Sequence, residues 1–156
     1  MAPANAFDDD CEYDAEDPPG YRCGMTRVGS SDKGNVLAVN VLEMPPGESL
    51  CPYHYEYEEE WAVVLSGSVL LRTPAGEETL RPGDVVPFAA GPEGAHKVSN
   101  AGDEVARVLM FSSAREPAVA VYPDSDKIGV WPGNEADKVM LHRRDGAVPY
   151  YEGESA

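Results

Sequence analysis

The chain has 156 residues, the size of one ordinary domain, which is enough to bury a core without disulfides or structural zinc. Its 12 lysines and arginines are outnumbered by 28 aspartates and glutamates, and the resulting formal charge of −16 repels phosphate backbones and anionic bilayers. We therefore expect neither a nucleic-acid partner nor a role at a membrane surface.

Two further features of the composition predict a protein of the cytoplasm. No apolar run approaches the roughly 20 residues that a membrane helix needs, and the acidic N-terminus lacks the basic start and apolar core of a signal peptide. The three cysteines, Cys11, Cys23 and Cys51, form no C-x-x-C pair, so neither a disulfide framework nor a zinc ribbon is indicated. We expect free thiols and a cytoplasmic location.

Short strands dominate the predicted secondary structure. Residues 1–34 are rich in Asp, Glu, Pro and Gly, which predicts an extended arm with at most one short strand. From residue 35 onward, apolar or alternating runs recur between Gly and Pro turn signals. The predicted strands are 36–44, 49–55, 61–65, 68–73, 77–80, 85–88, 96–100 and 105–112. Such regular spacing without a helical period predicts an all-β fold, an antiparallel sandwich or barrel.

Residues 116–156 follow the last of these strands as a C-terminal extension. Two more strands are predicted there, at 118–122 and 139–141, with a turn at 131–134 between them. The chain is thus predicted to contain an N-terminal arm (1–34), a β-barrel (35–115) and an extension (116–156) that packs on the barrel or on a partner subunit. Because open sheet edges need covering and both terminal segments are long enough to reach a neighbour, we expect a homodimer.

Two of the three histidines lie in strand-like sequence with carboxylates nearby. Alternate residues of an extended strand share a face, so His54 and Glu56 are expected to point the same way. A hairpin at 58–59 would return Glu60 to this pair, and His96 would join from a more distant strand. Two imidazoles and two carboxylates suit Mn, Fe, Ni, Cu or Zn better than Ca or Mg. The sequence therefore predicts a site for a divalent transition metal.

Three other polar residues are not expected to bind the metal. Cys51 precedes His54 by three residues, so strand alternation predicts that its thiol faces away from the metal. Asn100 is expected to brace the turn that follows the strand of His96, and His142 is expected to lie on the surface.

The segment from Gly47 to Gly67 resembles the first motif of the cupin family. That motif is a glycine followed by His-x-His, three or four residues, a Glu, six residues and a glycine. Here His54-x-Glu56 stands in the His-x-His place, Glu60 follows after three residues, and Gly67 follows after six more.

A second block, Gly83 to Asn100, resembles the second cupin motif. It contains the Pro-x-Gly element as Pro92-Glu93-Gly94, then His96, with the asparagine four residues beyond it. The two motifs occur in the right order and separation, and together the resemblance covers about residues 36–112. This is much more specific than either motif alone.

The resemblance implies a double-stranded β-helix, or jelly-roll, barrel with a metal in its mouth, in a small single-domain bacterial protein. It implies His54, Glu60 and His96 as metal ligands. Glu56 departs from the pattern, because it replaces the second histidine. It is either a fourth ligand or a general base that the metal leaves free, and a third possibility is that the metal has been lost.

Two classes of function fit these residues. Cupins include sugar isomerases, carboxylate decarboxylases and dioxygenases, so the first expectation is a metal-dependent enzyme acting on a small sugar-like or carboxylate-like molecule. The alternative is a non-catalytic module that holds a small ligand or a metal. The net charge disfavours phosphorylated ligands unless a local basic spot exists, for which Lys97, Arg72 and Arg107 are candidates.

Overall fold

The structure, a computed structural model, describes residues 4–8, 11–29 and 35–154. Its strands are β1 (Glu12–Tyr13), β2 (Gly24–Gly29), β3 (Leu37–Met44), β4 (Tyr55–Glu56), β5 (Glu60–Ser66), β6 (Val69–Thr73), β7 (Gly76–Leu80), β8 (Val85–Phe88), β9 (Lys97–Ser99), β10 (Ala106–Ser113), β11 (Ala118–Tyr122), β12 (Lys127–Trp131) and β13 (Val139–His142). Short 3-10 turns occur at η2 (Pro92–Gly94), η3 (Pro123–Ser125) and η4 (Glu135–Asp137). Within the described ranges, no helix is both long and apolar enough to cross a membrane.

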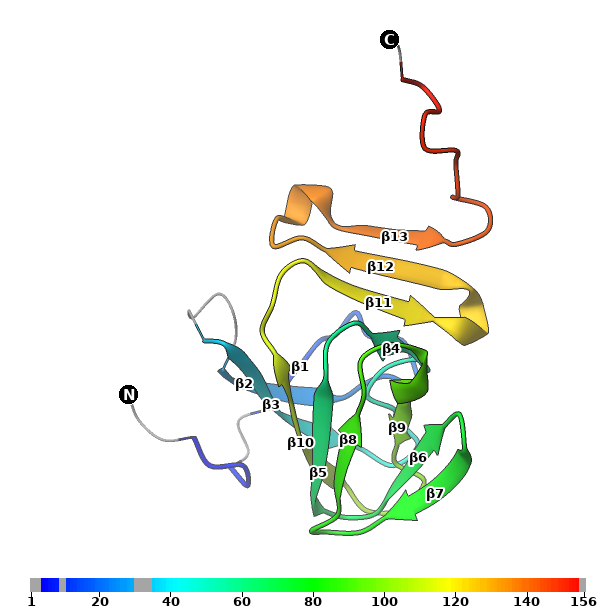
Figure 1. Ribbon diagram of the computed structural model, residues 1–156. Helices are drawn as coiled ribbons and strands as arrows, with labels where there is room; N and C mark the ends of the chain where they lie inside the picture. The colour runs from blue at the N-terminus through cyan, green and yellow to red at the C-terminus, as the bar shows by residue number, and fades with distance from the viewer. Residues whose placement is uncertain (1–3, 9–10, 30–34, 155–156) are drawn as a thin grey trace.

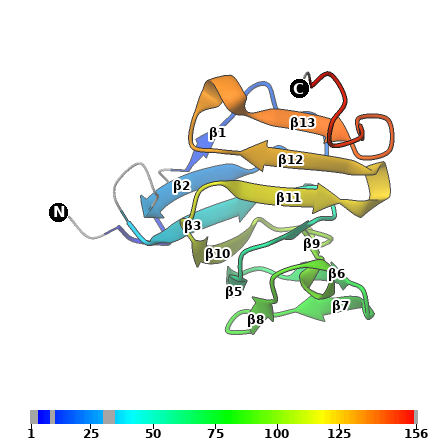
Figure 2. The same cartoon turned by 45° about the horizontal axis from the view of Figure 1, so that its top comes forward.

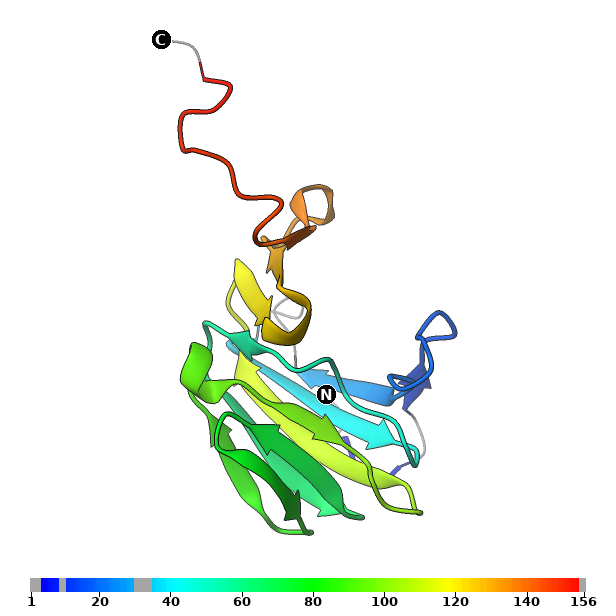
Figure 3. The same cartoon turned by 90° about the vertical axis from the view of Figure 1, so that its right-hand side faces the viewer.

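The strands form three sheets, and every pairing between named strands of the described chain is antiparallel. A six-stranded sheet has the order β1-β2-β3-β10-β5-β8, and a three-stranded sheet has the order β7-β6-β9. The third sheet, β13-β12-β11-β4, stands at one end of the other two (Figures 1, 2 and 3). The predicted all-β antiparallel class is confirmed.

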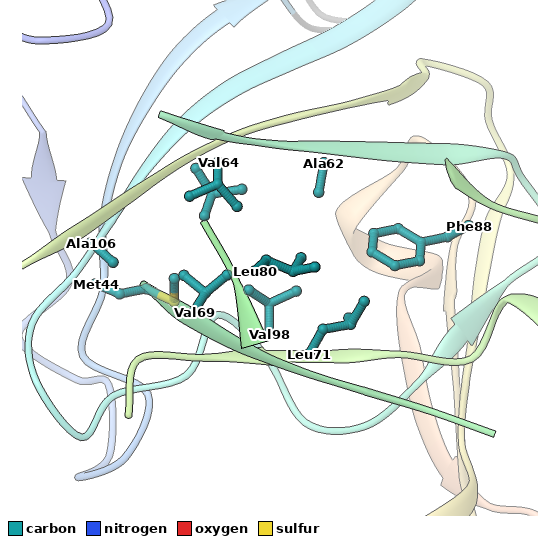
Figure 4. Packing of buried hydrophobic residues seen from close by; sticks show 10 residues of the cluster. Met44, Ala62, Val64, Val69, Leu71, Leu80, Phe88, Val98 and Ala106 are labelled. Carbon is teal, nitrogen blue, oxygen red and sulfur yellow. The ribbon is translucent and has the colours of Figure 1, made fainter. Parts of the chain in front are cut away.

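The core lies between the six-stranded and the three-stranded sheets (Figure 4). Alternation along the strands produces it: Ala62 and Val64 point inward from β5, and Val69 and Leu71 point inward from β6. The other members of the cluster are Met44, Leu80, Phe88, Val98, Ala106 and Val108. Burying one large side chain of this kind contributes about 1.5–3 kcal/mol. Phe88, at the end of β8, extends the cluster toward the two histidines.

The N-terminal residues join the edge of the large sheet through β1 and β2. Arg107 on β10 anchors the chain before β1. Its guanidinium donates to Glu43 Oε2 at 2.8 Å and 2.5 Å, and to the backbone oxygens of Ala6 and Asp8 at 3.3 Å and 3.1 Å. Arg107 is therefore occupied at the N-terminal segment and supplies no basic spot to the histidines.

A strand pairing and an ion pair help to attach the C-terminal strands to the rest of the fold. One is the pairing of β11 with β4, in which Ala120 lies opposite Glu56. The other is an ion pair in which Arg72 donates to both carboxylate oxygens of Asp124, at 2.6 Å and 3.0 Å, while its guanidinium lies 3.9 Å from the centre of the Tyr53 ring. A bidentate pair of this kind fixes orientation as well as distance.

The predicted strand at 49–55 is wrong as a continuous element. Isolated bridges occur at Ser49 and His54 with bends between them, and of this range only Tyr55 lies in a strand, β4. Pro52 lacks the N–H that a ladder needs, which accounts for the interruption. The predicted hairpin is also wrong, because β4 pairs with β11 while β5 pairs with β8 and β10.

Candidate metal centre

A backbone bridge brings the two predicted histidines together. The His54 amide donates to the His96 carbonyl at 3.1 Å, and the His96 amide donates to the His54 carbonyl at 2.8 Å. The two imidazole ring centres consequently lie 4.7 Å apart, although 42 positions separate the residues in sequence. The histidines of the two sequence motifs are thus neighbours in the fold.

Glu60, the first residue of β5, completes a three-residue cluster. Its Oε2 lies 3.9 Å from His54 Nε2 and 3.7 Å from His96 Nε2. The three candidate ligand atoms all lie within 4.8 Å of one another. Two ligands that each lie about 2.1 Å from a common ion are at most about 4.2 Å apart, so both carboxylate–imidazole distances fit one cation.

The hydrogen bonds of the two rings fix which nitrogens face the cluster. His54 Nδ1 donates to the Pro52 carbonyl at 3.0 Å, and His96 Nδ1 donates to the Gly94 carbonyl at 2.9 Å. A carbonyl oxygen only accepts, so each Nδ1 carries the proton and each neutral ring keeps the lone pair of Nε2 free. In the described chain, His96 Nε2 is a buried side-chain nitrogen without a hydrogen-bond partner. Such a nitrogen costs about 1–3 kcal/mol, and a bound cation would satisfy it.

Packing holds the imidazoles in this orientation. The Phe88 ring stacks on His96 with centres 3.6 Å apart and planes inclined by 10°, and Tyr122 stacks on His54 at 5.8 Å and 24°. Gly94 sits in the tight loop that supplies the carbonyl to His96. A Cβ at this position would collide with the backbone carbonyl of Ala89, so the loop requires glycine here.

Burial sets the protonation states of the cluster. It lowers the pKa of His54, and it lowers the pKa of His96 to about 4, so both rings are neutral at neutral pH. Burial, and after it the nearby charge of Glu56, raises the pKa of Glu60 to about 8. At neutral pH both Nε2 lone pairs are therefore available to a cation, and binding of the cation would release a proton from Glu60.

Glu56 lies beside the cluster but outside it. Its Oε1 is 3.9 Å from His54 Nε2, and its side chain is 26% exposed, compared with 14% for Glu60. Burial, followed by the charge of Glu58, raises its pKa above the ordinary value for a glutamate. Glu56 thus lies on the solvent side of the three candidate ligands.

A known protein family matches the segment that contains the candidate metal ligands. The profile of the family described as "Cupin domain" matches residues 40–112. The chain contains a cupin domain. No curated protein sequence matches the chain. The family match spans β3 to β10 and contains His54, Glu56, Glu60 and His96.

Solved structures resemble this cupin over most of its length. A proposed sugar phosphate isomerase from Acidithiobacillus ferrooxidans is 25% identical, with 90% of this chain and 89% of that chain covered and a TM-score of 0.77. A cupin described as a sugar phosphate isomerase from Silicibacter pomeroyi is 24% identical, with 91% and 94% covered and a TM-score of 0.74. The polyketide cyclase RemF from Streptomyces resistomycificus is 20% identical, with 76% and 83% covered and a TM-score of 0.61. The predicted jelly-roll class is confirmed.

Cys51 lies outside the candidate ligand group, as predicted. Its Sγ is 3.4 Å from His54 Nδ1, the ring nitrogen that faces away from the group. The thiol is partly buried, and burial raises its pKa, so it is a neutral neighbour of the ring.

Asn100 braces the turn as predicted. Its side-chain amide donates to the carbonyls of Met44 and Glu104 at 2.8 Å and 2.7 Å, and its Oδ1 accepts from the Gly102 amide at 2.9 Å. His142 is exposed, also as predicted.

Sequence reasoning missed two side chains that contact the candidate ligands, Phe88 and Tyr122. Phe88 was visible as the apolar end of a strand, but nothing in the pattern indicates that it stacks on His96. Tyr122 lies outside the segment that the family profile matches, and it reaches His54 only because β11 pairs with β4.

Proposed function

We propose that this cupin is a metal-dependent isomerase of a small sugar or sugar phosphate, with the metal held by His54, Glu60 and His96 and with Glu56 as general base. The observation that carries the proposal is the convergence of two free imidazole Nε2 atoms and a carboxylate on one point, one of those nitrogens being buried and unpartnered. The similarity to a proposed sugar phosphate isomerase at 25% identity supports the choice of substrate class.

The chemistry follows from the positions of the side chains. A divalent Mn, Fe, Ni, Cu or Zn ion bound here would polarise the carbonyl and neighbouring hydroxyl oxygens of a substrate. Glu56 takes a proton from the carbon that bears the hydroxyl group and returns it to the former carbonyl carbon, while the hydroxyl proton moves to the carbonyl oxygen. An aldose and its ketose have the same composition, so no oxidant, reductant or second substrate is required.

The proposal is tested by following sugar interconversion in heavy water. The protein loaded with each candidate metal is incubated with five- and six-carbon aldoses and their phosphates, and products are measured by nuclear magnetic resonance. We expect a ketose that carries solvent deuterium at the carbon receiving the proton, loss of turnover after chelation, and recovery when the metal is restored. Absence of both ketose and C–H exchange for every sugar with every metal would contradict the proposal.

We also propose that the protein is a homodimer in which β13 contacts a second copy. Val139, Met140 and Leu141 are 40%, 47% and 47% exposed on this strand, which forms the edge of its sheet. An apolar, uncharged edge of this kind favours pairing with another chain. Light scattering is expected to give twice the chain mass of 16.8 kDa, and Leu141→Lys is expected to shift the protein toward the single-chain mass. A wild-type protein of single-chain mass at micromolar concentration would exclude this assembly.

The remaining expectations are part of the same proposal. We propose the division into an arm (1–34), a barrel (35–115) and an extension (116–156), and a cytoplasmic location. Three free thiols, Cys11, Cys23 and Cys51, are compatible with a reducing compartment.

A further inference from the structure

Three side chains form a row across the C-terminal strands on the face that carries Glu56. Tyr122 on β11 lies opposite Lys127 on β12, which lies opposite His142 on β13. Residues paired across antiparallel strands share a face, and so do residues two apart on one strand. Ala120 is two residues from Tyr122 and pairs with Glu56, so the row and Glu56 lie on one face.

Tyr122 brings a hydrogen-bond donor to the edge of the candidate metal centre. Its ring stacks on His54, and its hydroxyl forms no hydrogen bond with the residues that the structure describes. A phenolic hydroxyl is ordinarily protonated at neutral pH, so it is available to donate.

Lys127 adds a positive charge that no acidic side chain of the described residues neutralises through an ion pair. Its Nζ lies 5.5 Å from the centre of the Tyr122 ring, and it makes no ion pair with any described residue. The two nearest acidic residues in sequence are bound elsewhere: Asp124 pairs with Arg72, and Asp126 lies 3.7 Å from Arg143 Nε and 3.4 Å from Arg144 Nε. In a chain with a net charge of −16, a cation that lacks an anionic partner among the described residues and lies beside the candidate metal centre indicates an anionic ligand.

We propose that Tyr122 and Lys127 bind the phosphate of a phosphorylated sugar whose other end reaches His54, Glu60 and His96. An ammonium and a phenolic hydroxyl are both donors, and a phosphate monoester offers several charged acceptor oxygens. The Tyr122 ring centre lies 5.5 Å from Lys127 Nζ and 5.8 Å from the His54 ring centre, so one short carbon chain would reach from the candidate ligands to the ammonium. This inference rests on the proposed function and names its substrate class.

The proposed phosphate-binding cation is none of the three basic residues that the sequence offered as candidates. Arg107 is occupied by Glu43 and the N-terminal backbone, and Arg72 is occupied by Asp124. Lys97 lies over Tyr21, with Nζ 5.5 Å from that ring. The cation beside Tyr122 is Lys127, which comes from a strand that the sequence did not predict.

Calorimetry on the full-length protein, with and without metal, tests the inference independently of turnover. The probes are five- and six-carbon aldose phosphates, the same sugars without phosphate, and inorganic phosphate. We expect at least one sugar phosphate to bind about tenfold or more tightly than its parent sugar, because a charge-assisted hydrogen bond contributes that much. Lys127→Gln should remove most of this preference, Tyr122→Phe should reduce it, and neither should change the affinity for the neutral sugar.

Lys138→Gln is the matched control. It removes the same charge from the same extension, but Lys138 lies in the connection between β12 and β13, at the opposite end of this hairpin from Lys127 and 3.6 Å from exposed Glu135. We expect it to bind as the wild type does. Circular dichroism confirms that the variants are folded.

Two results would overturn the subsite. One is a Lys127→Gln variant with the wild-type preference for the phosphorylated sugar, and the other is inorganic phosphate that binds as tightly as any sugar phosphate. Either can occur while metal-dependent isomerisation persists, which would leave the proposed function standing. Conversely, a phosphate preference that depends on Lys127 in a protein without isomerase turnover would support the subsite and contradict the isomerase.

Discussion

Replacing His96 by alanine is expected to abolish tight binding of a divalent transition metal. His96 contributes one of three candidate ligands, and its Nε2 is buried, unpartnered and 3.7 Å from Glu60 Oε2. Even residues that only orient a ligand change metal affinity by about 10–100-fold, so removal of a ligand should weaken it by at least about 100-fold. Elemental analysis of protein purified without added metal, with competition against a chromophoric chelator, measures the loss.

Thermal unfolding measures metal binding by the same variant in a second way. A metal that binds only the folded protein stabilises it by about 4 kcal/mol at 1,000 times its dissociation constant, so the wild type should melt at higher temperature when metal is added. His96→Ala should not respond. His142→Ala is the control, because it removes an exposed imidazole and should keep both the metal and the shift. Stoichiometric metal at unchanged affinity in His96→Ala would exclude this centre.

Glu56→Gln is expected to lower the isomerisation rate by about 10²–10⁴-fold while leaving the metal bound. Glutamine keeps the shape and the hydrogen-bonding capacity of the side chain but accepts no proton at neutral pH. Glu56 lies beside His54 and outside the three-residue cluster, so its substitution leaves those three side chains in place. The measurements are kcat, KM and deuterium exchange at the substrate carbon, each alongside metal content.

Glu93→Gln is the matched control, because it makes the same change at an exposed position of η2 and should leave the rate unchanged. The two roles considered for Glu56 give opposite outcomes. If Glu56→Gln loses the metal together with its activity, Glu56 is a ligand, and its assignment as the base is wrong.

Local signals were sufficient for the barrel. The strand at 85–88 is found at its predicted bounds. The prediction 36–44 differs from β3 by one residue at its start, and 105–112 differs from β10 by one residue at each end. Such agreement is expected because alternation and turn residues are local properties. The grouping of His54, Glu60 and His96 was predictable for another reason: the spacing of two motifs encodes strand lengths and therefore which side chains meet.

Long-range pairing explains what the sequence did not reveal. β12 contains Lys127 and Gly129, which are both weak strand formers. This segment is a strand because it pairs with β11. Tyr122 was inside a predicted strand, yet its position over His54 depends on β11 pairing with β4, which no local pattern specifies. Cys51 is outside the ligand group as predicted, but strand alternation did not indicate that its thiol contacts His54 Nδ1, because Pro52 interrupts the strand.

Because β4 pairs with β11, two separate segments of the chain contribute residues to the rim of the site. The three clustered side chains come from the segment shared with other family members, whereas the aromatic ring and the free ammonium come from beyond it. If Tyr122 and Lys127 select the ligand as proposed, exchange of the last quarter of the chain would change the ligand while leaving His54, Glu60 and His96 themselves in place.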